Sequence, residues 1–242
     1  MLSLRRGQIT IAVLLFFFMS LGQVMAQAKY SRSSNPNFNR FQQKPFYYGI
    51  ALGYNSAFFQ VNQSKNFIDN GQFSVVESFN GGGFNIGVIG NLKIGRYFDL
   101  RSLINFSFSS RIMSYQEANS DIIRTERLSS TFVEVPFLFR FKSAPYKDKR
   151  AFIVTGFKYL YDASNNSNVQ TETFKLNISP HDFQYEIGAG MQFFLPFFIL
   201  SPEIKFSQGL GNILIYDQDL SQSRILDRIL SRSITFSLNF EG

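Results

Sequence analysis

Ten residues near the middle of the chain, FVEVPFLFRF at positions 132–141, alternate in a way that few folds accept. Successive side chains of a β-strand point to opposite faces, so the segment separates into two sets. One set contains both charged residues, Glu134 and Arg140. The other set is wholly apolar and consists of Val133, Val135, Phe137, Phe139 and Phe141. An apolar face beside a face that carries charges of both signs is typical of a barrel strand with lipid outside and a polar lumen inside.

Seven other segments alternate in a similar way, one of them less clearly, and together they predict an all-β fold, an eight-stranded antiparallel transmembrane barrel. These segments are 46–59, 83–92, 98–112, 151–161, 182–194, 198–210 and 233–240. Most are near the roughly 9–11 residues that a tilted transmembrane strand needs. Residues 151–161 are apolar on both faces, apart from Lys158. We expect Lys158 to point inward, because a lysine facing mid-bilayer lipid costs about 2–4 kcal/mol.

The connections between these segments alternate in length. Long connections at 60–82, 113–129, 162–181 and 211–232 separate short ones at 93–97, 142–150 and 195–196. Outer-membrane barrels show this pattern, with short turns in the periplasm and longer loops outside, so both termini are expected in the periplasm. The main alternative is a soluble β-sandwich with a core built from the 30 phenylalanines. That alternative does not account for the alternating loop lengths.

The charged residues on the predicted inward faces have both signs. An eight-stranded barrel is just wide enough inside for side chains to fill it, and a buried charge needs a partner. We therefore expect the acids to pair with the bases inside the lumen, in an order that the sequence leaves open. The acids are Glu134, Glu186 and Glu203, and the bases are Arg101, Arg140, Lys158 and Lys205. The inward-facing glycines at 188, 190 and 209 are expected to make room for large neighbours.

The N-terminal region divides into two parts ahead of the predicted barrel domain at 46–242. Residues 1–26 have a basic start, a short apolar centre and the small-residue cleavage site Val24-Met25-Ala26, as in a secretory signal peptide. A transmembrane anchor is the alternative. Residues 27–45 are polar and basic and indicate a flexible periplasmic tether. Because these two parts hold most of the excess positive charge, the net charge of +7 does not require a nucleic-acid partner.

Catalytic and metal-binding patterns are weak. The chain has no cysteine and a single histidine, His181, so a hydrolase or a lipid-modifying enzyme would depend on that residue. Asp217 and Asp219 supply only two carboxylates toward a calcium site. No glycine cluster has the spacing of a nucleotide-binding loop. We therefore expect no enzyme activity, no metal and no cofactor. Residues 219–232 have helical spacing and predict either a short loop helix or a partner surface.

Two segments resemble a known family. TFVEVPFLFRFKS at 131–143 and SPEIKFSQGLGNIL at 201–214 are similar to small outer-membrane barrels of the Bacteroidetes type, in particular the PorT/SprT family of the type IX secretion and gliding system. The resemblance implies an outer-membrane accessory protein that is needed to export cargo to the cell surface. Its partners would be membrane lipid and other secretion components, contacted by a monomeric barrel. A structural or adhesive barrel without a secretion role is the alternative.

Overall fold

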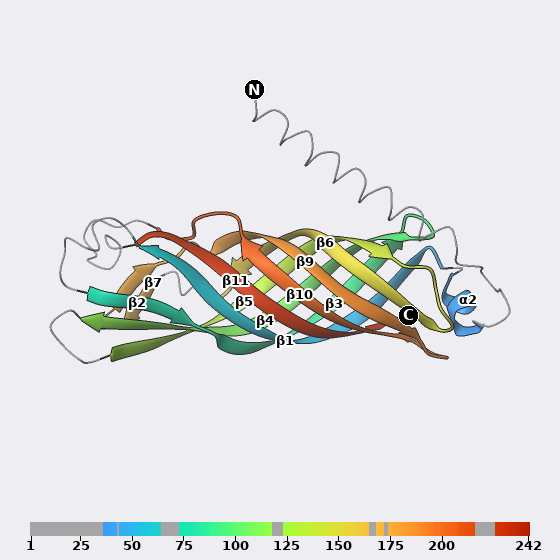
Figure 1. The fold of residues 1–242 in the computed structure, drawn as a ribbon, viewed down its shortest axis with the longest axis horizontal. Coiled ribbons are helices and arrows are strands. Elements are labelled where there is room, and N and C mark those ends of the chain that lie inside the picture. The colour runs from blue at the N-terminus through green and yellow to red at the C-terminus, as the bar shows by residue number, and fades with distance from the viewer. Residues whose placement is uncertain are drawn as a thin grey trace, which may run out of the picture.

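The structure, a computed structural model, describes residues 36–42, 44–63, 73–117, 123–164, 168–171, 174–215 and 226–242. Within these residues, eight long antiparallel strands form one closed barrel (Figure 1). In chain order they are β1 (Phe46–Gln63), β3 (Gly81–Lys93), β4 (Phe98–Glu117), β5 (Ile123–Lys142), β6 (Lys149–Asp162), β9 (His181–Phe194), β10 (Ile199–Gly209) and β11 (Leu226–Glu241). The predicted fold is confirmed, and every predicted barrel strand is present.

The ring closes between the first and last strands. β1 pairs with β11 from Gly49↔Glu241 to Gln63↔Leu226, and β4 pairs with β5 on the other side. Each of the eight strands therefore has a hydrogen-bonded neighbour on both sides. Closure satisfies the backbone groups that an open sheet edge would expose, which is the condition for a sheet inside a lipid bilayer.

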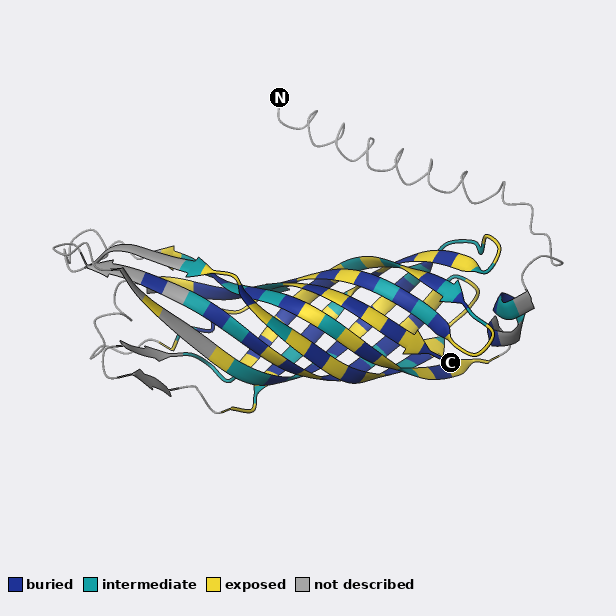
Figure 2. Ribbon diagram, turned by 90° about the horizontal axis from the view of Figure 1, so that it is seen from below, coloured by how far each residue is buried: buried dark blue, intermediate teal, exposed yellow. Residues whose placement is uncertain are grey.

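Side chains alternate between the lumen and the outer surface along the central part of the barrel strands. Figure 2 shows the result as alternating buried and exposed positions over the central part of the wall. In β5, Leu138 and Arg140 are fully buried, whereas Phe137 is 59% exposed. The outer surface is therefore a broad apolar band, and the polar residues fill the interior. This is the inverse of a soluble β-sandwich and argues against that alternative.

The two ends of the barrel differ. One, here called the short-turn end, holds the connections 94–97, 143–148 and 195–198 together with the C-terminus. The other, the long-loop end, carries β2 (Phe73–Phe79), which pairs with the outer half of β4, and a hairpin of β7 (Asn168–Thr171) and β8 (Phe174–Asn177). Both additions lie in segments that the sequence indicated only as loops.

Two sequence predictions near the long-loop end are wrong. The expected loop at 113–129 is largely an extension of the β4–β5 hairpin, with pairs as far out as Gln116↔Ile123. The expected helix at 219–232 is strand from Leu226 onward, and its first residues lie outside the described part of the chain. Ile229, which supported the helical spacing, pairs with Val61 of β1 and is fully buried. Pairing with an existing strand outweighed a weak helical pattern.

The segment before β1 is more ordered than the predicted tether. Residues Pro36–Gln42 form a short helix, α2, at the short-turn end (Figure 1). Its Phe38 and Phe41 are buried in a cluster with Tyr47, Phe194 and Ile199. Spacing of i and i+3 places both phenylalanines on one helix face, and a helix this short depends on such packing. Residues 1–35, which include the predicted signal peptide, lie outside the described residues. No described helix combines the length and apolarity needed to cross a membrane.

Candidate functional site

Ten charged side chains form a continuous series of ion pairs inside the barrel, here called the ion chain. Acids and bases alternate along it in the order Glu134, Lys158, Glu186, Lys205, Glu203, Arg101, Glu241, Arg140, Asp99 and Lys142. The nitrogen–oxygen distance is 2.6 Å for Arg101–Glu203 and 3.3 Å for Arg140–Glu241. The contacts of Lys158 and Lys205 with their glutamates measure 3.5, 3.6, 3.7 and 3.6 Å. The charges of the ion chain sum to zero.

All seven charged residues that the sequence assigned to the lumen lie in the ion chain, and all are buried. They are Arg101, Glu134, Arg140, Lys158, Glu186, Glu203 and Lys205. Arg140 does not pair with any of the three acids predicted from the sequence. Its partners are Asp99 and Glu241. The structure brings the seven residues together across five strands, β4, β5, β6, β9 and β10.

Sequence reasoning missed three members of the ion chain: Asp99, Lys142 and Glu241. Each lies near a strand end, two residues from another inward-facing residue. Asp99 precedes Arg101, Lys142 follows Arg140, and Glu241 follows Asn239. The period-two pattern therefore indicated that these side chains point inward, but their sequences resembled those of the adjacent turns. Lys142 and Asp99 extend the ion chain to the short-turn end.

Neutral polar groups support the ion chain. Arg101 Nε donates to Asn91 Oδ1 at 2.9 Å, the Tyr47 hydroxyl donates to Asp99 at 2.8 Å, and Ser207 Oγ donates to Glu186 at 3.0 Å. Removing a charge from water costs several kcal/mol, so a buried carboxylate or ammonium is tolerated only with such partners. Each interior member of the ion chain has two neighbours of opposite sign. The arrangement fills the lumen with charge without leaving a net charge there.

Two inward glycines leave space for bulky neighbours, as the sequence predicted. A Cβ atom on Gly190 would lie 2.5 Å from Cζ of Phe152, and one on Gly188 would lie 2.7 Å from Cγ of Lys205. Real side chains do not approach so closely, so a larger residue would displace the ring or the lysine stem. The glycines therefore belong to the packing of the lumen.

Near the long-loop end the lumen is closed by a cationic and aromatic stack. The Arg111 guanidinium carbon lies 4.7 Å from the ring centroids of both Phe59 and Phe132. Ile213, from the connection after β10, is buried, and its backbone oxygen accepts a hydrogen bond from Ser179 N at 2.8 Å. Loop residues and lumen side chains together cover this end of the barrel.

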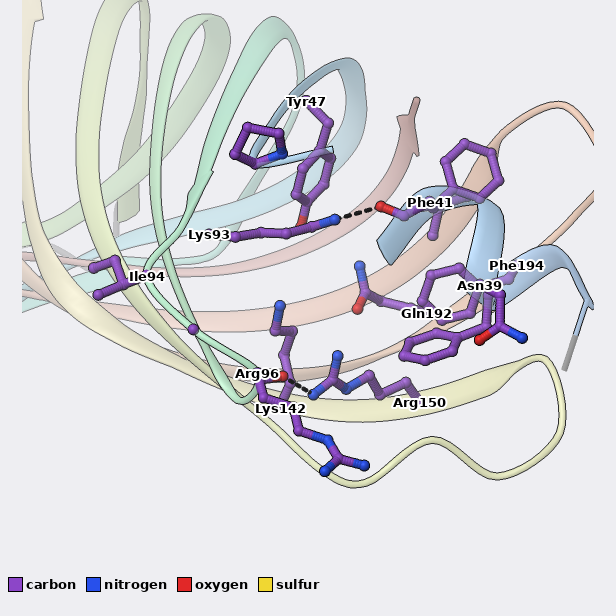
Figure 3. Close-up of a pocket in the computed structure, with 14 residues that line it drawn as sticks. Asn39, Phe41, Tyr47, Lys93, Ile94, Arg96, Lys142, Arg150, Gln192 and Phe194 are labelled. Atoms are coloured by element: carbon purple, nitrogen blue, oxygen red, sulfur yellow. Dashed lines mark hydrogen bonds between the residues drawn. The ribbon is translucent and has the colours of Figure 1, made fainter. Parts of the chain in front are cut away.

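At the short-turn end the ion chain opens into a cavity of about 610 Å³, here called the basal cavity (Figure 3). Lys93, Lys142 and Arg150 line it from the barrel wall, and α2 contributes Phe38 and Phe41. The cavity lies between the last ion pair and the docked helix. The lumen filled by the ion chain thus ends at a chamber with polar and aromatic walls.

His181 lies away from the lumen, on the exposed outer surface of β9. Its Nδ1 is 2.7 Å from the hydroxyl of Tyr159, and its ring stacks on the Tyr159 ring. Ser179 Oγ contacts the backbone of His181 rather than the ring. Among the described residues, no group of three metal-binding side chains occurs. Asp217 and Asp219 lie outside the described part of the chain.

A closed barrel with an apolar exterior and a buried, charge-balanced interior defines an integral membrane β-barrel protein. The family model of the outer membrane protein beta-barrel domain matches residues 25–214, and the chain belongs to that family. It is therefore an outer-membrane protein in contact with membrane lipid. Comparison with curated protein sequences gives no match.

Three solved structures resemble the chain at low sequence identity. The attachment invasion locus protein Ail of Yersinia pestis has 13% sequence identity and a TM-score of 0.39, and the match covers 82% of this chain and 100% of Ail. Neisserial surface protein A has 8% identity and a TM-score of 0.42, with 81% of this chain and 97% of that protein covered. OprG from Pseudomonas aeruginosa has 8% identity and a TM-score of 0.45, with 82% of this chain and 95% of OprG covered. These likenesses concern the fold alone.

Proposed function

We propose that this protein is a closed structural or adhesive barrel of the outer membrane, which acts through contacts at its long-loop end and not as a conduit. The buried ion chain is the observation that carries the proposal, because it occupies the space that a pore would need. The short-turn end then faces the periplasm, and the long-loop end, with β2 and the β7–β8 hairpin, faces outside. The barrel is monomeric and has no enzymatic role.

Conductance tests the closed lumen. We expect the purified full-length protein to give no stable large single-channel currents in planar lipid bilayers, because alternating ion pairs and the Arg111 stack fill the interior. Matched recordings from a known porin in the same bilayers show that insertion and detection work. Stable currents of porin size from this protein would contradict the closed-barrel proposal.

A second candidate function is assistance to type IX protein secretion. It is supported by the resemblance of residues 131–143 and 201–214 to the PorT/SprT family. Glu203 and Lys205, in the more specific of these segments, are members of the ion chain. The resemblance is therefore accounted for in part by the requirements of the lumen, which favours the structural proposal over the secretion role.

Deletion of the gene separates the two candidates. Under the structural proposal we expect exported cargo to reach the cell surface in normal amounts, because the barrel then takes no part in export. Surface proteins and periplasmic cargo are measured beside a strain that carries the restored gene, with a membrane-integrity assay as a control. Cargo that accumulates in the periplasm of cells with an intact outer membrane would overturn the structural proposal and select the secretion role.

A further inference from the structure

The basal cavity carries positive charge that its surroundings do not neutralise. Lys93, Lys142 and Arg150 line it, and none of the lining residues that the structure describes is acidic. Lys142 is already paired with Asp99 as the last member of the neutral ion chain. Lys93 and Arg150 lie outside the ion chain, and the ion pairs found among the described residues do not include them. These two side chains leave at least two positive charges at the cavity wall.

Both cations are held in place by neutral partners that leave their charge intact. Lys93 Nζ donates to the backbone oxygen of Phe41, at the end of α2. Arg150 Nε donates to the backbone oxygen of Ser143 at 2.6 Å, and its Nη2 donates to the backbone oxygen of Arg96. An ammonium has three donors and a guanidinium five, so each group keeps donors for a ligand. Figure 3 shows Lys93 and Arg150 extending toward the same space from different strands.

Aromatic rings line another part of the cavity wall, and Phe38 lies beside Arg150, with 5.7 Å between the guanidinium carbon and the ring centroid. Phe38 and Phe41 of α2 meet Phe194 of β9 there, with Phe38 and Phe194 in edge-to-face contact at 5.0 Å. The volume of about 610 Å³ falls in the usual range for small-molecule sites. Asp148, the acid nearest in sequence to Arg150, does not line the cavity, and its Oδ1 accepts a hydrogen bond from Phe38 N at 3.2 Å.

We infer that the basal cavity binds a phosphate monoester, with the phosphate on Lys93 and Arg150 and the organic part against the phenylalanine wall. A phosphate monoester carries about −1.5 to −2 charges at neutral pH, which matches two unneutralised cations, whereas one carboxylate does not. Guanidinium and ammonium groups are the usual partners of phosphate oxygens. A soluble phosphate ester and a lipid that ends in a phosphate monoester have the same recognised chemistry.

Two binding experiments on the full-length protein test the inference in two arms, the first in phosphatidylcholine nanodiscs and the second in mixed vesicles that contain phosphatidic acid. Phenyl phosphate, titrated by calorimetry, represents a soluble ligand. Retention of phosphatidic acid after detergent purification from mixed vesicles represents the lipid source. Lys93→Gln keeps a hydrogen-bonding side chain at a partly exposed position, so the barrel is expected to fold. Lys147→Gln, in the neighbouring turn but outside the cavity lining, is the matched control.

We expect saturable binding in at least one arm, weakened about tenfold or more by Lys93→Gln and unchanged by Lys147→Gln. Binding should also weaken as salt rises, because charge attraction contributes to it. Phosphatidic acid bound without phenyl phosphate identifies a lipid ligand, and the reverse identifies a soluble one. Absence of binding in both arms, or equal affinity in the two variants, would overturn the inference. None of these outcomes bears on the closed lumen.

Discussion

Replacing Arg101 with methionine is expected to lower the free energy of unfolding by about 3–5 kcal/mol, the largest effect of any single lumen substitution. Arg101 is fully buried in the middle of the ion chain, where it bonds Glu203 at 2.6 Å and also bonds Glu241. Methionine fills similar space but carries no charge. The substitution therefore leaves an excess negative charge on carboxylates that are buried from bulk water. Urea unfolding in detergent or lipid, followed by circular dichroism, measures the change.

Position in the ion chain provides the matched comparison. Glu134 is its terminal acid, and its partner Lys158 keeps Glu186 at 3.6 Å when Glu134 is replaced. Glu134→Leu should therefore destabilise the barrel clearly less than Arg101→Met. The double variant Arg101→Met with Glu203→Gln restores charge balance, so its loss should be smaller than the sum of the two single losses. Equal losses for Arg101→Met and Glu134→Leu would show that the lumen does not behave as one charge-balanced chain.

The barrel strands were predictable because each transmembrane strand has one face toward lipid and the other toward the lumen. Lipid excludes charge from one face, and the narrow lumen requires paired charge on the other, so the alternation in residues 132–141 allows one orientation. For residues 151–161 the cost of a lysine in lipid was the deciding argument, and Lys158 is buried in the structure. Where lipid and lumen both constrain a segment, its local sequence pattern is enough to predict the strand and its orientation.

Elements outside the bilayer lack this double constraint. β2 and the β7–β8 hairpin lie outside the ring of eight strands, and β2 does not alternate strictly between apolar and polar residues. α2 depends on two phenylalanines that dock on Phe194 and Ile199, residues more than 150 positions away in the chain. The basal cavity follows from that docking. A sequence pattern reports local periodicity, so contacts made between distant segments remained unseen.

The order of the ion chain was also beyond sequence reasoning, for a geometric reason. Which inward residues meet depends on strand register and on barrel closure. Arg101 reaches Glu241, 140 residues away, because closure of the ring through β1 leaves only β3 and β1 between β4 and β11. The alternation of side chains along a strand shows which charged residues point inward. Which of them meet depends on the stagger between strands around the whole barrel.

Placing an arginine in the middle of the outer apolar band should cost about 2–4 kcal/mol in a lipid bilayer. Ile187 suits the test, because it is 49% exposed on β9 and lies between Phe206 of β10 and Thr155 of β6. Its outward position leaves the lumen packing unchanged. In Ile187→Arg, the guanidinium must remain in lipid or distort the bilayer to reach water, and both outcomes disfavour the folded state.

The control is the same substitution at Leu210, which is 52% exposed and directly follows the long-loop end of β10. There an arginine reaches the membrane interface and should cost about 0–1 kcal/mol. Both variants are refolded into phosphatidylcholine vesicles and unfolded with urea, with circular dichroism as the signal because the chain has no tryptophan. In a protein whose outer surface met water, arginine at either site would be nearly neutral. Equal stability of the two variants would therefore contradict a lipid-facing band, whereas a loss confined to Ile187→Arg locates the middle of the bilayer on the barrel wall.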